Sequence, residues 1–152
     1  RHVPGADVTC VEKSPDAWPY LTANTADSGV RTMQADVFTY YKLLSEEYAD
    51  LIISNPPYLT GPEMGALMPE TAHEPAMALD GGADGLEFYR RIIAEAPDHL
   101  KKNGVLMMEI GYDQKDAVKE LLRESGRFEK IIGLTDLTGK DRIVAATVIT
   151  VK

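Results

Sequence analysis

The sequence of 152 residues has few of the features that mark disulfide-stabilised, membrane-spanning or nucleic-acid-binding proteins. A single cysteine, Cys10, excludes an intrachain disulfide and any metal site built from several cysteines. No apolar run reaches the ~20 residues that a membrane-spanning helix requires. Acidic residues outnumber basic ones, with 24 Asp+Glu against 16 Lys+Arg. The net charge of −8 disfavours a protein that must neutralise phosphates, so neither a membrane nor nucleic acid is an expected direct partner.

The remaining composition is typical of one globular domain. Hydrophobic residues make up 44% of the chain and charged residues 26%, which is not the signature of disorder. Residues 1–5 contain neither an initiator methionine nor a signal-peptide pattern. We therefore expect the chain to be part of a longer protein.

The few cysteine and histidine residues argue against a metal centre. Cys10 lies in an apolar, strand-like run, which predicts a buried and inert thiol. Such a lone cysteine fits a reducing compartment, and we expect a cytoplasmic location. His2, His73 and His99 lack the spacing of zinc ligands, so no metal is expected.

Hydrophobic periodicity predicts strands that alternate with helices. Strands are expected at residues 6–12, 30–35, 51–54, 105–110, 128–134 and 143–151. Helices are expected at about residues 15–27, 86–100 and 113–125, with Gly29, Asn103-Gly104 and Gly126 as their stops. Ser14 would cap the first helix, and Pro19 would either kink it or delay its start.

Two further segments qualify this pattern. Residues 38–47 read as a loop with one helical turn, and residues 59–84 as a long irregular segment with one helical turn near 62–68. The uninterrupted apolar run at 51–54 suits a strand buried on both faces of a parallel sheet. Together these segments predict an α/β fold with a largely parallel sheet and an antiparallel ending.

Polar residues follow several of the expected strands, where ligands bind in such sheets. Glu12 follows the first strand, where a carboxylate can accept hydrogen bonds from both ribose hydroxyls. Asp36 follows the second, where a carboxylate can accept from the exocyclic amine of adenine. Taken singly, Glu12 is a solvated acid and Asp36 is equally a turn residue. On adjacent strand ends they outline a nucleoside site.

Asn55-Pro56-Pro57-Tyr58 is the sharpest signal for chemistry. The two prolines remove two backbone donors and fix two φ angles, which leaves rigid, unused carbonyls. Asn55 adds an amide oxygen at a strand end, and Tyr58 adds a flat face. This arrangement can hold a planar NH₂ group by both of its hydrogens. A proline stop after a strand would explain Pro56 and Pro57, but not the residues on either side.

With these two acids before it, the tetrapeptide resembles that of the S-adenosylmethionine-dependent N-methyltransferases. Three further blocks are similar to the HemK/PrmC family, the release-factor glutamine N5-methyltransferases. They are residues 74–93, which contain ALDGG and FYRRII, EIGYDQ at 109–114 and DLTGKDRIV at 136–144. The block at 74–93 makes the resemblance specific, and the similarity covers essentially the whole chain.

The resemblance implies a Rossmann-like class I methyltransferase domain with sheet order 3-2-1-4-5-7-6. It implies S-adenosylmethionine as cofactor and a peptide chain release factor as protein substrate. Glu12 would hold the cofactor ribose, and Asp36 with the backbone of Val37 would hold the adenine. Asn55 and the Pro56 carbonyl would accept the two substrate amide hydrogens, and Tyr58 would pack against the substrate side chain. Asn55 is also expected among the cofactor-binding residues.

The chain departs from the family pattern in two respects. A glycine-rich loop after the first strand, which cradles the methionine part of the cofactor, is not in this sequence. An N-terminal helical domain that docks the substrate is also missing. Residues 1–152 would thus be an N-terminally truncated methyltransferase domain. Gly81-Gly82 follows no predicted strand and cannot replace the loop.

Some assignments and alternatives stay open. Glu74, Glu109 and Arg142 fall in family-like blocks, yet a salt bridge or loop anchor explains each of them without chemistry. One rival function is a nucleic-acid adenine N6-methyltransferase, which would need base flipping and phosphate contacts. The other is a non-catalytic fragment that cannot bind cofactor.

Overall fold

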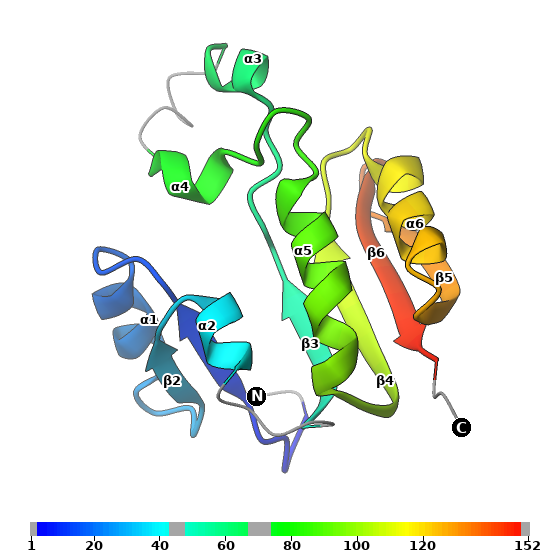
Figure 1. Cartoon of the computed structure of the whole chain (residues 1–152). Helices are drawn as coiled ribbons and strands as arrows, with labels where there is room; N and C mark the ends of the chain where they lie inside the picture. The colour runs from blue at the N-terminus through cyan, green and yellow to red at the C-terminus, as the bar shows by residue number, and fades with distance from the viewer. Residues whose placement is uncertain (1–2, 43–47, 67–73, 150–152) are drawn as a thin grey trace. The chain divides into compact units, whose positions relative to one another are not determined.

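The computed structural model describes residues 3–42, 48–66 and 74–149, which form two compact units, one ending at residue 45 and the other starting at residue 46. The first unit contains β1 (Thr9–Glu12), α1 (Trp18–Thr25), β2 (Arg31–Gln34) and α2 (Val37–Tyr41). The second contains β3 (Ala49–Ser54), α3 (Gly61–Met64), α4 (Ala76–Leu79), α5 (Glu87–Glu95), the 3₁₀ helix η2 (Ala96–His99), β4 (Leu100–Glu109), α6 (Lys115–Glu124), β5 (Phe128–Thr135) and β6 (Asp141–Val148) (Figure 1). No helix in these ranges is long and apolar enough to cross a membrane.

The first unit is built on two parallel strands. β1 pairs with β2 so that Glu12 lies opposite Gln34, and α1 connects the two strands. After β2, α2 buries Phe38 and Tyr41, whose rings meet edge to face with centroids 6.4 Å apart. Cys10 lies on β1 but is only half-buried, because this pair of strands is thinly covered; the prediction of a buried thiol was wrong.

The first helix starts later than predicted. Ser14 is buried, and its hydroxyl accepts hydrogen bonds from the backbone N–H groups of Asp16 and Ala17, each at 3.2 Å. These bonds hold a turn before the helix, and α1 begins at Trp18 with Pro19 in its first turn. A proline is tolerated there because the first-turn N–H groups have no partner inside the helix. Pro19 was predicted either to kink the helix or to delay its start, and the structure shows the delayed start.

The second unit is a four-stranded sheet in the order β3-β4-β6-β5. β3 and β4 are parallel, whereas β6 runs antiparallel to both β4 and β5. The predicted antiparallel ending is therefore confirmed. Taken separately, the orders β2-β1 and β3-β4-β6-β5 correspond to the 3-2 and 4-5-7-6 parts of the order that the resemblance implies.

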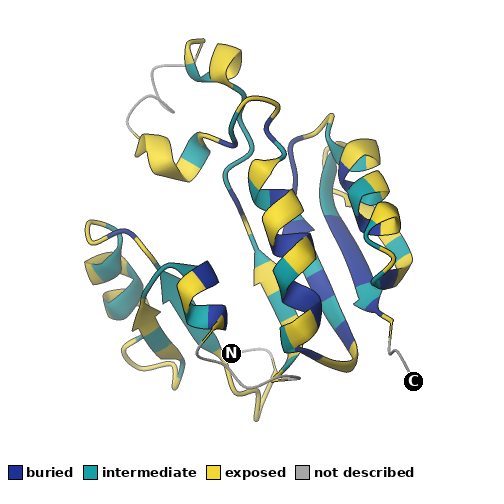
Figure 2. Cartoon of the chain, viewed as in Figure 1, coloured by how far each residue is buried: buried dark blue, intermediate teal, exposed yellow. Residues whose placement is uncertain are grey.

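The core of this unit lies between the sheet and two helices. Figure 1 shows α5 and α6 on the same face of the sheet. Fully buried side chains come from β4, the residue that follows it, β6 and both helices: Leu106, Met108, Ile110, Val144, Tyr89, Val118 and Leu122 (Figure 2). Both helices are amphipathic, which is why their apolar stripes could be found from the sequence.

β3 is not buried on both faces, contrary to the prediction. Leu51 is 48% exposed and Ile53 67% exposed, because β3 is an edge strand of the four-stranded sheet and its second face lacks a helix among this unit's described residues. An edge strand with exposed apolar side chains can accept a further strand.

The predicted helix at 86–100 is shorter than expected. α5 ends at Glu95, and residues Ala96–His99 form the 3₁₀ helix η2, which contains Pro97. A proline cannot donate the hydrogen bond that would continue the α-helix. β4 then begins at Leu100 instead of residue 105, so Asn103-Gly104 lies inside the strand, with Asn103 at φ +62°. The sequence signal read there as a helix stop thus marks an irregularity in β4.

The irregular segment at 59–84 is present largely as expected. The predicted helical turn near 62–68 corresponds to α3 up to Met64, and residues 67–73 lie outside the described part. A second turn, α4, was not predicted.

Candidate active site

In the first unit, Glu12 and Asp36 lie at the carboxyl edge of the β1–β2 pair. The backbone N–H of Ala35 donates to the Glu12 carbonyl at 2.9 Å, which ties the two strand ends together. The predicted adjacency of these strand ends is confirmed. The Glu12 carboxylate accepts from the Ser14 backbone N–H at 2.6 Å, which fixes its direction.

Asp36 is the N-cap of α2. One carboxylate oxygen accepts from the Phe38 backbone N–H at 2.9 Å, and the other lies 2.9 Å from the Lys13 ammonium. Val37 is the first residue of the helix. The Lys13 side chain is 61% exposed, so this ion pair contributes at most about 1 kcal/mol and leaves Asp36 able to exchange partners.

In the second unit, Asn55 to Tyr58 form the loop that follows β3. Asn55 is exposed, whereas Pro56 is buried and Tyr58 half-buried. Within the described residues, neither the Asn55 side chain nor the Pro56 carbonyl makes a hydrogen bond, so neither acceptor is occupied by another part of the described chain.

The segment after this loop is tied to residues 79–81. The Leu59 N–H donates to the Leu79 carbonyl, and the Gly81 N–H donates to the Leu59 carbonyl, both at 2.8 Å. These bonds form a short parallel bridge between Leu59 and Asp80. The loop is therefore fixed from its C-terminal side by the glycine-rich part of the block at 74–93.

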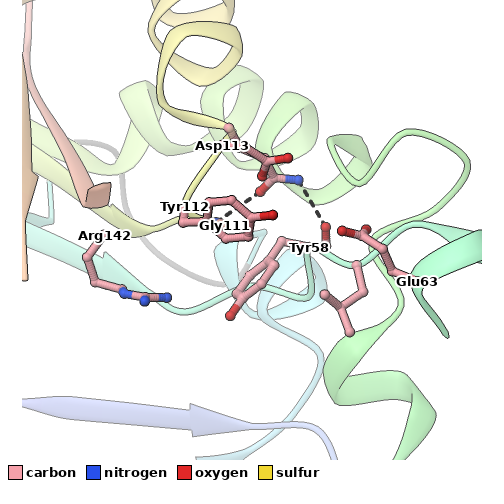
Figure 3. Close-up of a pocket in the computed structure, with 8 residues that line it drawn as sticks. Tyr58, Glu63, Gly111, Tyr112, Asp113 and Arg142 are labelled. Atoms are coloured by element: carbon pink, nitrogen blue, oxygen red, sulfur yellow. Dashed lines mark hydrogen bonds between the residues drawn. The ribbon is translucent and has the colours of Figure 1, made fainter. Parts of the chain in front are cut away.

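Gln114, which precedes α6, also holds the loop, through its side chain. Its side-chain NH₂ donates to the Tyr58 carbonyl at 3.0 Å and to the Gly85 carbonyl at 3.3 Å. Its side-chain oxygen accepts from the Gly111 N–H at 3.0 Å and lies 3.3 Å from the Tyr89 hydroxyl. The dashed bonds in Figure 3 connect this amide to Tyr58 and Gly111.

Two glycines pack directly against Tyr58. A Cβ atom at Gly81 would lie 2.7 Å from the Tyr58 Cα, and one at Gly85 would lie 2.4 Å from the Tyr58 carbonyl oxygen. Gly85 also has φ +71°, a left-handed conformation that side chains disfavour. Only glycine fits at either position without displacing the loop.

Tyr89 of α5 completes this support. It is fully buried, and its hydroxyl also reaches the Glu109 carbonyl at 3.0 Å. Burial raises the pKa of the Tyr89 hydroxyl, so this group stays protonated and serves as a donor to carbonyl and amide oxygens.

A cavity of about 210 Å³ opens beside Tyr58, lined by Tyr58, Leu59, Glu63, Gly111, Tyr112, Asp113, Gln114 and Arg142. In Figure 3, Arg142 extends from β6 on the left and Glu63 from α3 on the right. The Thr60 hydroxyl and backbone N–H both donate to Glu63 and lower the pKa of its carboxyl. Arg142 is held by an ion pair with Asp136 at 3.2 Å.

The predicted site residues fall in both units. Tyr58 lines the cavity of the second unit, with Asn55 and Pro56 just before it, whereas Glu12, Asp36 and Val37 belong to the first. Their roles remain predictions. Gln114, Gly85 and Tyr89 were missed as contributors, although the blocks at 74–93 and 109–114 contain them. Glu74 is exposed, Glu109 contributes its carbonyl, and Arg142 forms the expected salt bridge while also lining the cavity.

Comparisons with known proteins show which proteins this chain resembles. No protein-family model matches the chain. A release factor glutamine methyltransferase from Geobacter sulfurreducens is 37% identical over 149 residues, 97% of this chain and 52% of the relative. A ribosomal protein uL3 glutamine methyltransferase from Bordetella pertussis is 42% identical over 115 residues, 73% of this chain and 38% of the relative. The chain spans about half the length of the release factor methyltransferases that it matches.

Solved structures show the same similarity. The release-factor-specific protein-(glutamine-N5) methyltransferase from Alicyclobacillus acidocaldarius matches with a TM-score of 0.51 and 25% identity, covering 97% of this chain and 83% of that one. Other structures that share the fold are also methyltransferases. The chain therefore has the fold of the S-adenosylmethionine-dependent class I methyltransferases, and its predicted resemblance to the release factor glutamine methyltransferases is confirmed over almost its whole length.

Proposed function

We propose that the natural protein containing this chain transfers a methyl group from S-adenosylmethionine to the side-chain amide nitrogen of a glutamine in a protein. The observation that carries the proposal is the Asn55–Tyr58 loop, held from several sides while Asn55 and the Pro56 carbonyl remain unbonded in the described structure. The names of the relatives support glutamine as the methylated residue.

The chemistry of the amide explains why such a loop is needed. An amide nitrogen is a poor nucleophile, because its lone pair is delocalised into the carbonyl. The Asn55 side-chain oxygen and the Pro56 carbonyl accept the two hydrogens of the NH₂ group and thereby fix the direction of the nitrogen lone pair. Their partial negative charges also favour the positive charge that develops on nitrogen during transfer. Tyr58 offers its ring as a wall for the substrate side chain.

The residues of the first unit fit the nucleoside part of the cofactor. Glu12 and Asp36 present carboxylate oxygens at neighbouring strand ends, the chemistry that ribose hydroxyls and an adenine amine require. The Val37 backbone and Asn55 complete the proposed cofactor-binding set. When bound, S-adenosylmethionine supplies a methyl group activated by its sulfonium.

A release factor is the proposed substrate, because several relatives whose alignments cover 95–97% of this chain are named release factor glutamine methyltransferase. Ribosomal protein uL3 is a second candidate, favoured by the 42% identical relative. We further propose that the missing strand and glycine-rich loop belong to residues outside this sequence. β3 is an edge strand of the four-stranded sheet, and its backbone edge, unpaired within the described residues, can accept a strand beside it.

The test is methyl transfer by the natural polypeptide with radiolabelled cofactor. Release factor, uL3 and duplex DNA are offered together, and the labelled residue is identified by mass spectrometry. Label on a glutamine side chain is expected, whereas label in DNA would favour the adenine methyltransferase. An absence of cofactor binding in a calorimetric titration would favour the non-catalytic alternative. The assay is repeated with Asn55→Ala, which removes one of the two proposed substrate acceptors. Asn24→Ala, at an exposed asparagine of α1, is its matched control.

A further inference from the structure

We propose that Gln114 is a positioning residue that sets the place of the two substrate acceptors, Asn55 and the Pro56 carbonyl. This inference rests on the proposed function. Gln114 lies outside the Asn55–Tyr58 loop in sequence, yet its side chain binds the carbonyl of Tyr58, two residues after Pro56.

All the hydrogen-bonding capacity of the Gln114 amide is used within the protein. The NH₂ group faces two carbonyl oxygens, those of Tyr58 and Gly85, and the amide oxygen faces two donors, the Gly111 N–H and the Tyr89 hydroxyl. A flipped amide would direct its NH₂ group at the Gly111 N–H, so the network permits one orientation only. The side chain is thus locked in one orientation.

The backbone of Gln114 is equally fixed. Its own N–H donates to the Gly111 carbonyl at 3.0 Å, and its carbonyl accepts from the Val118 N–H at 3.0 Å in the first turn of α6. Val118 is fully buried in the core of the second unit. The amide therefore transmits the position of a well-packed helix to the Tyr58 carbonyl.

The prolines make this support effective at the reacting end of the loop. Between the Pro56 and Tyr58 carbonyls, the ring of Pro57 fixes its φ angle, so only the ψ of Pro57 and the φ of Tyr58 can turn. With so few soft torsions between them, a displacement of the Tyr58 carbonyl is passed on in part to Pro56. Because a misplacement of about 1 Å can lower a rate by about 10²-fold, this link matters for transfer.

The test compares three variants of the natural polypeptide. Gln114→Met keeps the length of the side chain but removes all four hydrogen bonds. Gln114→Glu keeps the acceptors but replaces both donors with a carboxylate oxygen that faces two carbonyls. Ala117→Glu, at an exposed position of α6, gives the same change in charge as Gln114→Glu without touching the loop.

Both Gln114 variants should lower kcat about 10–100-fold, while the cofactor dissociation constant and KM stay within about threefold, because the lost interaction acts on alignment in the transition state. Rates are referred to the folded fraction, counted by stoichiometric cofactor binding. Hydrogen exchange at the Leu59 and Gly81 amides should accelerate in both variants, since these bonds continue the loop. Ala117→Glu should match the wild type in every measurement.

A kcat for folded Gln114→Met within about twofold of the wild type would overturn the inference, because a purely structural residue would change only the folded fraction. Unchanged hydrogen exchange at Leu59 and Gly81 would overturn it as well. Failure of the proposed function looks different, because the wild type itself would then transfer no methyl group to glutamine. In that case the exchange measurement alone decides whether Gln114 holds the loop.

Discussion

Replacing Gly85 with alanine tests the close packing around Tyr58 directly. The new Cβ would lie 2.4 Å from the Tyr58 carbonyl oxygen, 1.0 Å short of the 3.4 Å at which ordinary contact begins. It would also lie 2.6 Å from the Gln114 side-chain nitrogen. The Tyr58 atoms near this Cβ are its backbone carbonyl oxygen and carbon, so rotation of a side chain cannot relieve the clash with Tyr58. The loop must retreat by about 1 Å, or the segment that carries Gly85 must move away.

A matched control separates this clash from the cost of the backbone conformation. Gly126 has φ +63° and nothing within 4 Å of its would-be Cβ. Alanine in a left-handed conformation costs about 1–2 kcal/mol in either place. At Gly85, the loss of the part-buried hydrogen bond at the Tyr58 carbonyl adds about 0.5–1.5 kcal/mol.

The assay is urea unfolding of both variants, followed by single-turnover methyl transfer in the natural polypeptide. Gly85→Ala should lose clearly more free energy of unfolding than Gly126→Ala. Its transfer rate should fall about 10²-fold through the displaced loop, whereas that of Gly126→Ala should not change. Equal stability losses together with wild-type transfer by Gly85→Ala would refute the reasoning.

Three other perturbations have defined outcomes. Asn55→Ala should lower single-turnover transfer about 10²–10³-fold with little effect on folding, because one of two oriented acceptors is lost; a near wild-type rate would contradict its role. Asp84→Asn should reduce stability above the unfolded-state pKa of 3.8, and the difference should disappear as the pH falls through about 2, because hydrogen bonds from Arg90 and Leu86 lower the pKa of Asp84 to about 2; thermal unfolding across this range measures it. The 152-residue chain alone should bind S-adenosylmethionine weakly in a calorimetric titration, since the loop implied for the methionine part is not among its residues.

The sequence predicted the elements whose apolar residues repeat regularly. The amphipathic helix α6 and the strands β5 and β6 form close to their predicted places, because burial against one face of a sheet requires that periodicity. β4 is present as well, but it begins at Leu100 instead of residue 105. Boundaries were less predictable where local features override the pattern. Hydrogen bonds to the Ser14 hydroxyl hold a turn that delays α1, and Pro97 lacks the N–H that would continue α5. The exposure of β3 depends on which strands and helices surround it in space, and its own residues carry no information on that.

The candidate site shows the same division. Asn55, Pro56 and Tyr58 could be proposed as site residues because their chemistry is specific and local. Gln114 could not, because a glutamine before a helix has no special pattern and acquires its role only through a carbonyl 56 positions earlier in the chain. The glycines of residues 80–85 were noticed as a family-like block, but their close approach to Tyr58 is a property of the folded chain.

The composition of the loop explains why its support comes from elsewhere. Pro56 and Pro57 have no N–H groups, so this stretch cannot tie itself to the protein through its own donors and offers carbonyl oxygens instead. A neighbour that fixes such a loop must bring donors, and the NH₂ group of Gln114 brings two on one side chain. A charged lysine would also donate, but its flexible stem and full charge would pull the carbonyls out of line with the substrate. The amide of Gln114 thus suits a loop in which the Pro56 carbonyl is proposed to accept a substrate hydrogen.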